Sequence, residues 1–123
     1  NMKLIKDIKV LQSKNIKNLS SSFYSLSFLL SKNLSKNRFN IIKFLNTNGV
    51  GTSIYYPHPV PRIKYYKNKY KYNPRAFLNA QKISDDSISV SVSPYLSKTN
   101  IDYICSMINL AIKKYKKIWK KNY

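Results

Sequence analysis

The sequence predicts one small domain of the α/β or α+β class. Its 123 residues fit a single domain, and its apolar fraction of 43% supplies one modest core. Short segments in which apolar residues alternate with serine are separated by segments in which apolar residues recur at helical spacing. We therefore expect a small mixed or antiparallel sheet with helices packed on one face.

The first 20 residues are rich in lysine and asparagine, and their apolar positions recur at helical spacing: Leu4, Ile5, Ile8 and Leu11. Asn1 precedes Met2, so the chain does not open on an initiator methionine. We interpret residues 1–20 as a linker or helix tail of something longer, and residues 21–123 as the domain itself.

Residues 22–31 predict a half-buried strand. Serines occupy one face of this segment, and the other face carries Tyr24, Leu26, Phe28 and Leu30. A helix is expected next, with Ser35 as its N-cap and with an apolar face made of Phe39, Ile42 and Leu45, supported by Ile41 and Phe44. It should end at Asn48-Gly49, because glycine readily adopts the left-handed conformation after a helix. Residues 50–56 predict a second strand.

Prolines at alternate positions, Pro57, Pro59 and Pro61, predict a stiff and extended segment over residues 57–61. A helix should start with Asn73 as cap and Pro74 in its first turn, and its face continues through Ala76, Phe77, Ala80, Ile83 and Ser84.

Residues 87–94 alternate as a strand does and end at a proline. Ser97 is then placed to cap a last helix. One stripe of that helix holds Ile101, Ile104, Cys105, Ile108, Ile112, Tyr115 and Trp119. Cys105 lies within this stripe and is expected in the core.

The composition excludes several kinds of site. The only acids are four aspartates, too few for a hard-cation cage or a di-iron bundle. One cysteine, Cys105, forms no internal disulfide, and Cys105 with His58 makes no tetrahedral zinc site. The longest apolar stretch, residues 23–30, is too short to span a bilayer, and lysines interrupt any signal-like run at the start. We expect a soluble, cytoplasmic chain without membrane contact.

The net charge of +19 leaves a nucleic-acid partner open. Lysines and tyrosines interleave over residues 62–75, and a second basic run lies at 113–121. A small basic RNA-binding or ribosome-associated protein is therefore one alternative. Lysine far outnumbers arginine, however, in a sequence rich in Asn, Ile and Tyr, so codon bias explains much of the charge. Non-specific polyanion binding at low salt is expected in either case.

Three segments in order resemble the DegT/DnrJ/StrS aminotransferases. Residues 49–59 (GVGTSIYYPHP) resemble the G-I-G-T-x-x-H-Y-P-x-P signature, and residues 77–83 (FLNAQKI) are similar to the F-P-N-A-E-K helix start. Residues 90–108 resemble the L-S-L-P-x-x-P-x-L-T ending through Pro94, Leu96, Ser97, Ile101, Tyr103, Ile104 and Ile108. The resemblance covers residues 20–112 and falls within the C-terminal small domain of these fold-type I aminotransferases.

The resemblance implies a role in amination of nucleotide-linked keto-sugars by a pyridoxal-phosphate enzyme of amino-sugar or polysaccharide biosynthesis. In that family the Schiff-base lysine and the acid at the pyridinium nitrogen lie in a preceding large domain. The resemblance therefore implies that the cofactor is held by that large domain, that residues 1–20 come from it, and that no catalytic residue lies in this chain, which is inactive alone. It also implies contacts with the large domain and a homodimer mate.

The same resemblance implies that Tyr55, Tyr56, His58 and Arg62 close over the nucleotide-sugar substrate. Tyr56 matches the family's tyrosine, whereas Tyr55 stands where histidine is usual, and Pro61 and Arg62 replace L-H-x-Q-type residues. His58 and Arg62 are candidates for binding a diphosphate. The alternatives are strand-end packing for the tyrosines, an exposed loop position for His58 and a solvated charge for Arg62. A decayed remnant that folds poorly is a further alternative for the whole chain.

Overall fold

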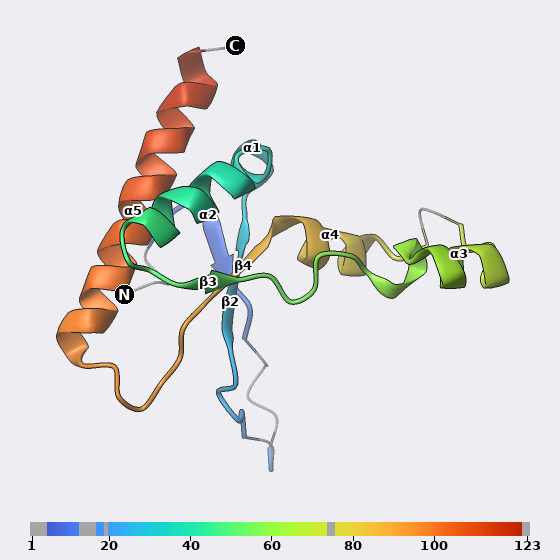
Figure 1. The fold of residues 1–123 in the computed structure, drawn as a ribbon, viewed down its shortest axis with the longest axis horizontal. Coiled ribbons are helices and arrows are strands. Elements are labelled where there is room, and N and C mark those ends of the chain that lie inside the picture. The colour runs from blue at the N-terminus through green and yellow to red at the C-terminus, as the bar shows by residue number, and fades with distance from the viewer. Residues whose placement is uncertain (1–4, 13–16, 19, 74–75, 122–123) are drawn as a thin grey trace.

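A four-stranded antiparallel sheet forms the centre of the molecule (Figure 1). The computed structural model describes residues 5–12, 17–18, 20–73 and 76–121, of which 118–121 by their backbone only. The strand order is β1 (Ile8–Val10), β2 (Leu26–Leu30), β4 (Ser87–Val90) and β3 (Thr52–Ser53). All three neighbouring pairs are antiparallel, so the expected mixed α+β class with an antiparallel sheet is confirmed.

The register of β2 against β4 separates an apolar face from a serine face. Phe28 pairs with Ile88, and both side chains are fully buried. On the other face Ser27 pairs with Ser89, and their hydroxyl oxygens lie 2.6 Å apart. The predicted alternation is therefore correct, although β2 and β4 are shorter than the predicted segments 22–31 and 87–94.

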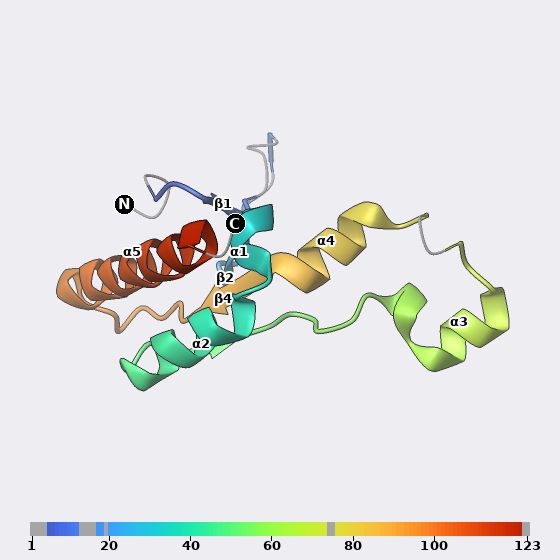
Figure 2. The ribbon, with the colours of Figure 1, turned by 90° about the horizontal axis from the view of Figure 1, so that it is seen from above.

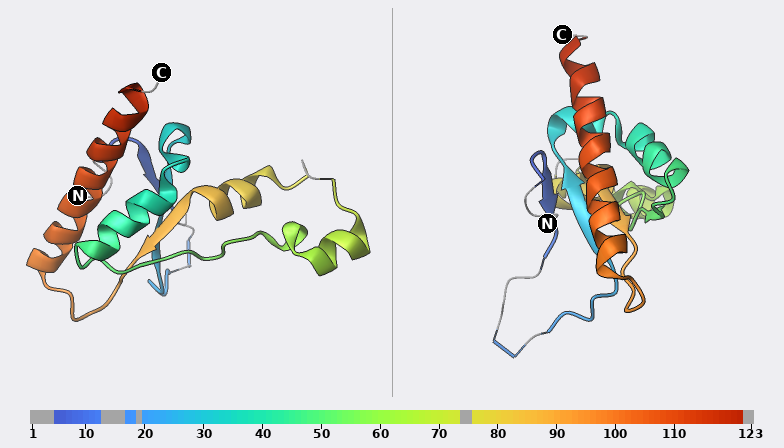
Figure 3. Two further views of the ribbon diagram at one scale, coloured as in Figure 1. Left: turned by 45° about the horizontal axis from the view of Figure 1, so that its top comes forward. Right: turned by 90° about the vertical axis from the view of Figure 1, so that its left-hand side faces the viewer.

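Three helices cover the apolar face: α1 (Lys32–Ser35), α2 (Arg38–Thr47) and α5 (Lys98–Lys121). Leu34, Leu45 and Ile108, one from each helix, are buried in the same cluster as Phe28 and Ile88. Figures 2 and 3 show α5 running beside α2 as the longest element. The helices α1, α2 and α5 thus pack on one face of the sheet, as expected. None of the described helices is long and apolar enough to cross a membrane.

The remaining elements project away from this core. The segment after β3, here called the arm (residues 54–73), contains the 3₁₀ turn η2 (Val60–Arg62) and helix α3 (Lys64–Tyr70), and α4 (Leu78–Asp86) leads back into β4. In Figures 1 and 2, α3 lies at the far end of the molecule from α5. No residue of α3 is buried, and its main contacts are with the neighbouring turn η2, so its conformation depends on local contacts.

Several predicted element boundaries are wrong. The apolar residues near the N-terminus recur at helical spacing, but residues Ile8–Val10 form a strand. This strand pairs with the edge of β2, whose backbone N–H and C=O groups would otherwise lack partners. Whether residues 1–20 belong to another domain stays a prediction. Of residues 50–56 only Thr52–Ser53 form a strand, and the proline segment continues into η2 rather than staying extended throughout.

The helix caps are partly as predicted. Gly49 has a φ of +73° directly after α2, as expected, and Ser97 Oγ accepts the Asn100 N–H at 3.1 Å. Ser35, however, ends α1 and caps nothing, since its hydroxyl instead donates to Asp86. Helix α2 begins at Arg38, and Phe39 is 76% exposed because the face of α2 that packs inward carries Ile41 and Leu45.

The helix α4 starts later than predicted. Phe77 occupies its N-cap position and Leu78 is its first residue, so Asn73 is not the cap of α4. Pro74 lies outside the described residues. Helix α3 was not predicted, since its lysine and tyrosine run lacks an apolar stripe.

A pair of leucines tests the assignment of the core. Leu45 is fully buried and Leu110 is half exposed on α5, so Leu45→Ala should lower the free energy of unfolding by about 2–5 kcal/mol and Leu110→Ala by less than about 1 kcal/mol. Urea unfolding followed by circular dichroism measures both. Equal losses for the two variants would contradict the packing of α2 on the sheet.

Candidate functional site

The arm and α4 enclose two adjoining hollows. The first, here called the aromatic hollow, is lined mostly by rings and apolar side chains, among them Tyr56, Pro59, Tyr72, Phe77 and Ile83. The second, the cationic hollow, has a volume of about 520 Å³ and is lined by His58, Arg62, Lys67, Tyr72, Asn73 and Gln81. His58, Pro61 and Tyr72 border both, so the two hollows form one continuous depression of a size that small molecules occupy.

The structure brings the four residues singled out by the sequence to this depression. Tyr55 and Tyr56 line the aromatic hollow with ring centroids 6.0 Å apart in an edge arrangement. His58 stands at the junction, and Arg62 lines the cationic hollow only. Tyr55, Tyr56 and His58 are exposed, so all three are accessible to a ligand.

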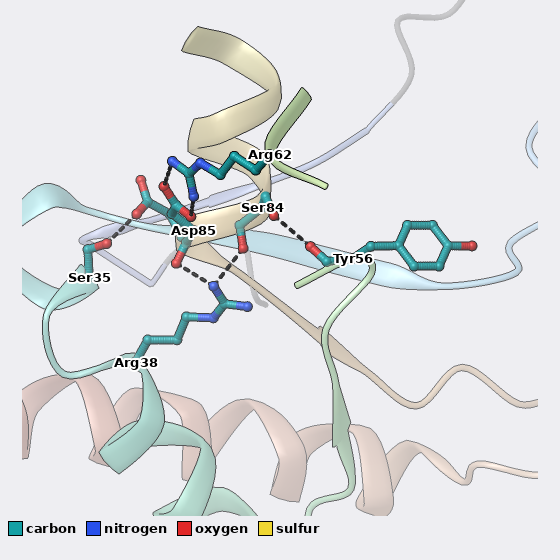
Figure 4. A network of polar contacts seen from close by, with 7 residues as sticks. Ser35, Arg38, Tyr56, Arg62, Ser84 and Asp85 are labelled. Carbon is teal, nitrogen blue, oxygen red and sulfur yellow. Dashed lines mark hydrogen bonds and ion pairs between the residues drawn. The ribbon is translucent and has the colours of Figure 1, made fainter. Parts of the chain in front are cut away.

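Arg62 is held by an aspartate that sequence reasoning did not single out. Its two terminal nitrogens donate to the two carboxylate oxygens of Asp85 at 2.6 and 2.8 Å (Figure 4). This hydrogen bonding lowers the pKa of the Asp85 carboxyl and raises the pKa of the Arg62 guanidinium. Both side chains remain about two-fifths exposed, so the pair fixes geometry more than it stabilises the fold.

Beneath this pair lies Arg38, the most buried charged residue that the structure describes, with 6% of its surface exposed. Its Nη1 donates to the carbonyl oxygens of Ser84 and Asp85 at 2.6 and 2.5 Å. Burial lowers the pKa of the Arg38 guanidinium, and the charges of Asp85 and Asp86 oppose that shift. Arg38 thus ties the start of α2 to the end of α4.

The last turn of α4 therefore carries two contacts with the arm. The Ser84 hydroxyl donates to the carbonyl of Tyr56 at 2.7 Å, and Asp85 holds Arg62. Figure 4 shows the Tyr56 ring pointing away from this network, which leaves it free to form a wall of the aromatic hollow. We call this set the latch: Arg38, Tyr56, Arg62, Ser84 and Asp85.

Sequence reasoning missed Arg38, Ser84 and Asp85 as residues that position the site. One signal was available. The chain has only four acids, and two of them are adjacent at 85–86. In so basic a chain, adjacent carboxylates indicate a cluster of paired charges.

The comparisons with known proteins identify the family. The model of the DegT/DnrJ/EryC1/StrS aminotransferase family matches residues 1–109. The chain belongs to this family. Among curated protein sequences, none matches.

Solved structures agree on the fold. Spr1654 of Streptococcus pneumoniae, assigned as a sugar aminotransferase, aligns in its apo-form with a TM-score of 0.80 at 21% identity, over 97% of this chain and 29% of that one. Helicobacter pylori PseC, an aminotransferase involved in pseudoaminic acid biosynthesis, aligns with a TM-score of 0.65 at 14% identity, over 73% and 24%. DesV of S. venezuelae aligns with a TM-score of 0.73 at 13% identity, over 89% and 27%.

The chain thus spans between 24% and 29% of the length of these three structures. It corresponds to the C-terminal portion of sugar aminotransferases, which confirms the resemblance drawn from the three sequence segments.

This family depends on pyridoxal phosphate, but the described residues do not fit a site for that cofactor. Every described lysine is exposed except Lys116, which is partly buried and bound to Asp7. None lies in an enclosed setting with a carboxylate, as a Schiff-base lysine requires. Nor do the described residues contain a group of three metal-ligating side chains.

Matched variants distinguish what the two arginines of the latch contribute to the free energy of unfolding. Arg38→Gln removes the donor from two inward-facing carbonyls and should lower the free energy of unfolding by about 2–4 kcal/mol. Arg62→Gln removes an exposed ion pair and should cost less than about 1 kcal/mol. Urea denaturation measures both variants, and a smaller loss for Arg38→Gln than for Arg62→Gln would contradict the latch.

The pH dependence of the Asp85–Arg62 pair follows from the lowered pKa of Asp85. Because the folded pKa lies below the unfolded one, the pair stabilises the fold above the ordinary aspartate pKa, and this contribution is lost as pH falls through the folded pKa. In Arg62→Gln the Asp85 pKa should rise toward its ordinary value, as a carboxyl-carbon NMR titration would show. An unchanged Asp85 pKa in that variant would mean that the bidentate pair is absent in solution.

Proposed function

We propose that this chain is the C-terminal portion of a pyridoxal-phosphate-dependent aminotransferase that aminates nucleotide-linked keto-sugars in the cytoplasm. The single observation that carries the proposal is the family match over residues 1–109. The similarity in fold to Spr1654, which is assigned as a sugar aminotransferase, supports the substrate class. The cofactor would be bound by the part of the enzyme that these residues do not represent, and a homodimer mate would complete the assembly.

Within that enzyme the arm would bind and orient the substrate. The Tyr56 ring offers an apolar face for a sugar or base and a hydroxyl for hydrogen bonding. His58 at the junction of the hollows would donate a hydrogen bond to an oxygen of the substrate. Arg62, held in place by Asp85, would offer the substrate those N–H groups that do not donate to Asp85. Closure of the arm would exclude water from the transfer of the amino group, which the cofactor carries out when bound.

The test uses the assembled enzyme, in which this chain is joined to the large domain. Tyr56→Ala should raise KM for the nucleotide-sugar about tenfold, the effect of losing one good binding contact. Tyr95→Ala is the matched control, because Tyr95 is 94% exposed and lines none of the hollows described. Transamination is followed by formation of the amino-sugar product. If the assembled enzyme aminates no nucleotide-linked keto-sugar, the proposal is wrong.

Binding of single-stranded RNA is a second candidate, favoured by the surface of α3. Tyr66 and Tyr70 stack with ring planes 8° apart, and Lys69 lies over the rings of Tyr65 and Tyr70 at 5.5 and 5.4 Å. Exposed rings between lysines suit base stacking and phosphate contacts. This function requires measurable binding of an oligonucleotide at physiological salt, with an affinity that falls steeply as salt rises.

A further inference from the structure

We propose that the side of α5 that points away from the sheet binds the surface of a membrane that contains anionic phospholipids, with its lysines against the lipid phosphates and Leu110 in the headgroup region. This inference goes beyond the proposed function, because it concerns a side of the molecule that the site does not use. No described residue of α5 lines either of the two hollows. The inference also gives a role to the basic run at residues 113–121.

Helical spacing determines which residues of α5 point away from the sheet. Ile108 and Ile112 are buried in the core, so residues about half a turn from them point outward. Leu110, Lys113 and Lys117 follow one another at intervals of about one turn on that outward side. Their exposure agrees, because Leu110 is 50% exposed and both lysines are exposed. We call the following set the outer face of α5: Leu110, Lys113, Lys114 and Lys117.

The outer face carries positive charge that the described residues do not neutralise. Within the part of the chain that the structure describes, Lys113 and Lys117 form no ion pair, and residues 103–123 include no acid. Lys114 differs from these two, because its ammonium nitrogen lies 5.1 Å from the centre of the Phe44 ring on α2. Lysines that cluster on one side of a helix are attracted to the negative surface of a membrane that contains anionic lipids.

Helix α2 continues this surface beside α5. The contact of Lys114 with Phe44 joins the two helices, and Figures 2 and 3 show them side by side. The outward side of α2 carries Phe39, which is 76% exposed, and Lys43, which is exposed one turn later. Residues 32–47 include no acid. An exposed apolar side chain next to lysines thus occurs on both helices.

This composition favours a lipid surface over single-stranded RNA. Base stacking needs exposed rings among the cations, whereas Leu110, the apolar residue among the lysines of the outer face, is aliphatic. The stacked tyrosines lie on α3, at the far end of the molecule from α5 (Figures 1 and 2). Lysine acts as a point charge, and a point charge is attracted to a lipid surface without the geometry of an arginine fork.

Such binding needs no membrane-spanning segment. The expectation of a chain without membrane contact rests on the lack of an apolar stretch long enough to span a bilayer. A helix with a basic side and exposed apolar residues instead lies in the plane of the membrane surface, with those residues at the level of the headgroups.

The experiment measures binding of the full 123-residue chain to lipid vesicles by sedimentation at 0.15 M salt. One set of vesicles contains phosphatidylcholine alone, and in the other about a third of the lipid is phosphatidylglycerol. We expect binding to the second set only. Lys113→Gln/Lys117→Gln should weaken it about twenty-five-fold, because each lysine at an anionic lipid surface contributes about fivefold. Leu110→Asn should weaken it about fivefold, because the exposed half of the leucine side chain no longer leaves water.

Matched control variants lie outside the outer face. Lys64→Gln/Lys67→Gln removes the same charge from α3, and screening at this salt limits charge effects beyond about 8 Å, so binding should weaken less than about twofold. Leu78→Asn changes a leucine of α4 that is 62% exposed, and it should leave binding unchanged. Circular dichroism shows whether each variant is folded.

Three results would overturn the inference. Equal losses for the two lysine pairs would mean attraction by net charge alone, and equal effects of Leu110→Asn and Leu78→Asn would mean that no apolar contact forms. Tighter binding of a single-stranded oligonucleotide than of vesicles, through the same lysines of α5, would favour RNA.

The same measurement on the assembled enzyme keeps this inference separate from the proposed function. Vesicle binding by the chain that is lost in the assembled enzyme would mean that the rest of the enzyme covers α5, and it would also overturn the inference. None of these results bears on amination of a keto-sugar, which the transamination assay tests by itself.

Discussion

The buried guanidinium of Arg38 is the contact on which the geometry of the site depends. It donates to two successive carbonyls at the end of α4, and these lie where the helix would otherwise leave inward-facing acceptors without partners. Because those same residues, Ser84 and Asp85, hold the arm through Tyr56 and Arg62, a single side chain of α2 fixes α4 and the arm together. The arm buries few side chains of its own, so this hydrogen-bond network determines its position.

The core and the arm differ in what their large apolar side chains do. On the sheet, burial of Phe28, Ile88 and Ile108 stabilises the fold. On the arm, large rings stay in contact with solvent and pack against one another and against Lys69. A ligand can therefore reach the arm's side chains while the sheet and α5 keep the framework rigid.

The sequence predicted the sheet and the last helix well, because alternation on β2 and β4 and the stripe of α5 are strong periodic signals. It failed at β1, where the pairing needs of β2 override helical spacing, and at α3, which has no apolar stripe to detect. Tyr55, Tyr56, His58 and Arg62 were found through a motif that is local in sequence. Asp85 and Arg38 were missed, because contacts spanning 23 and 46 residues leave no local pattern.

Three of the four acidic residues of the chain form ion pairs that the structure describes. No acidic residue occurs between Asp7 and Asp85, and Asp7, Asp85 and Asp86 each form an ion pair: with Lys116 of α5, with Arg62 of the arm and with Lys82 of α4. The pairs of Asp7 and Asp85 connect different elements, and the pair of Asp86 lies within α4. None of the three pairs neutralises a lysine of α3. The lysines of α3 are consequently left without one of these three carboxylates as a partner, on a helix with no buried residue. Only Lys67 among the α3 lysines lines the cationic hollow, so the placement of α3, and not the amount of charge, decides which of its lysines can face a ligand there.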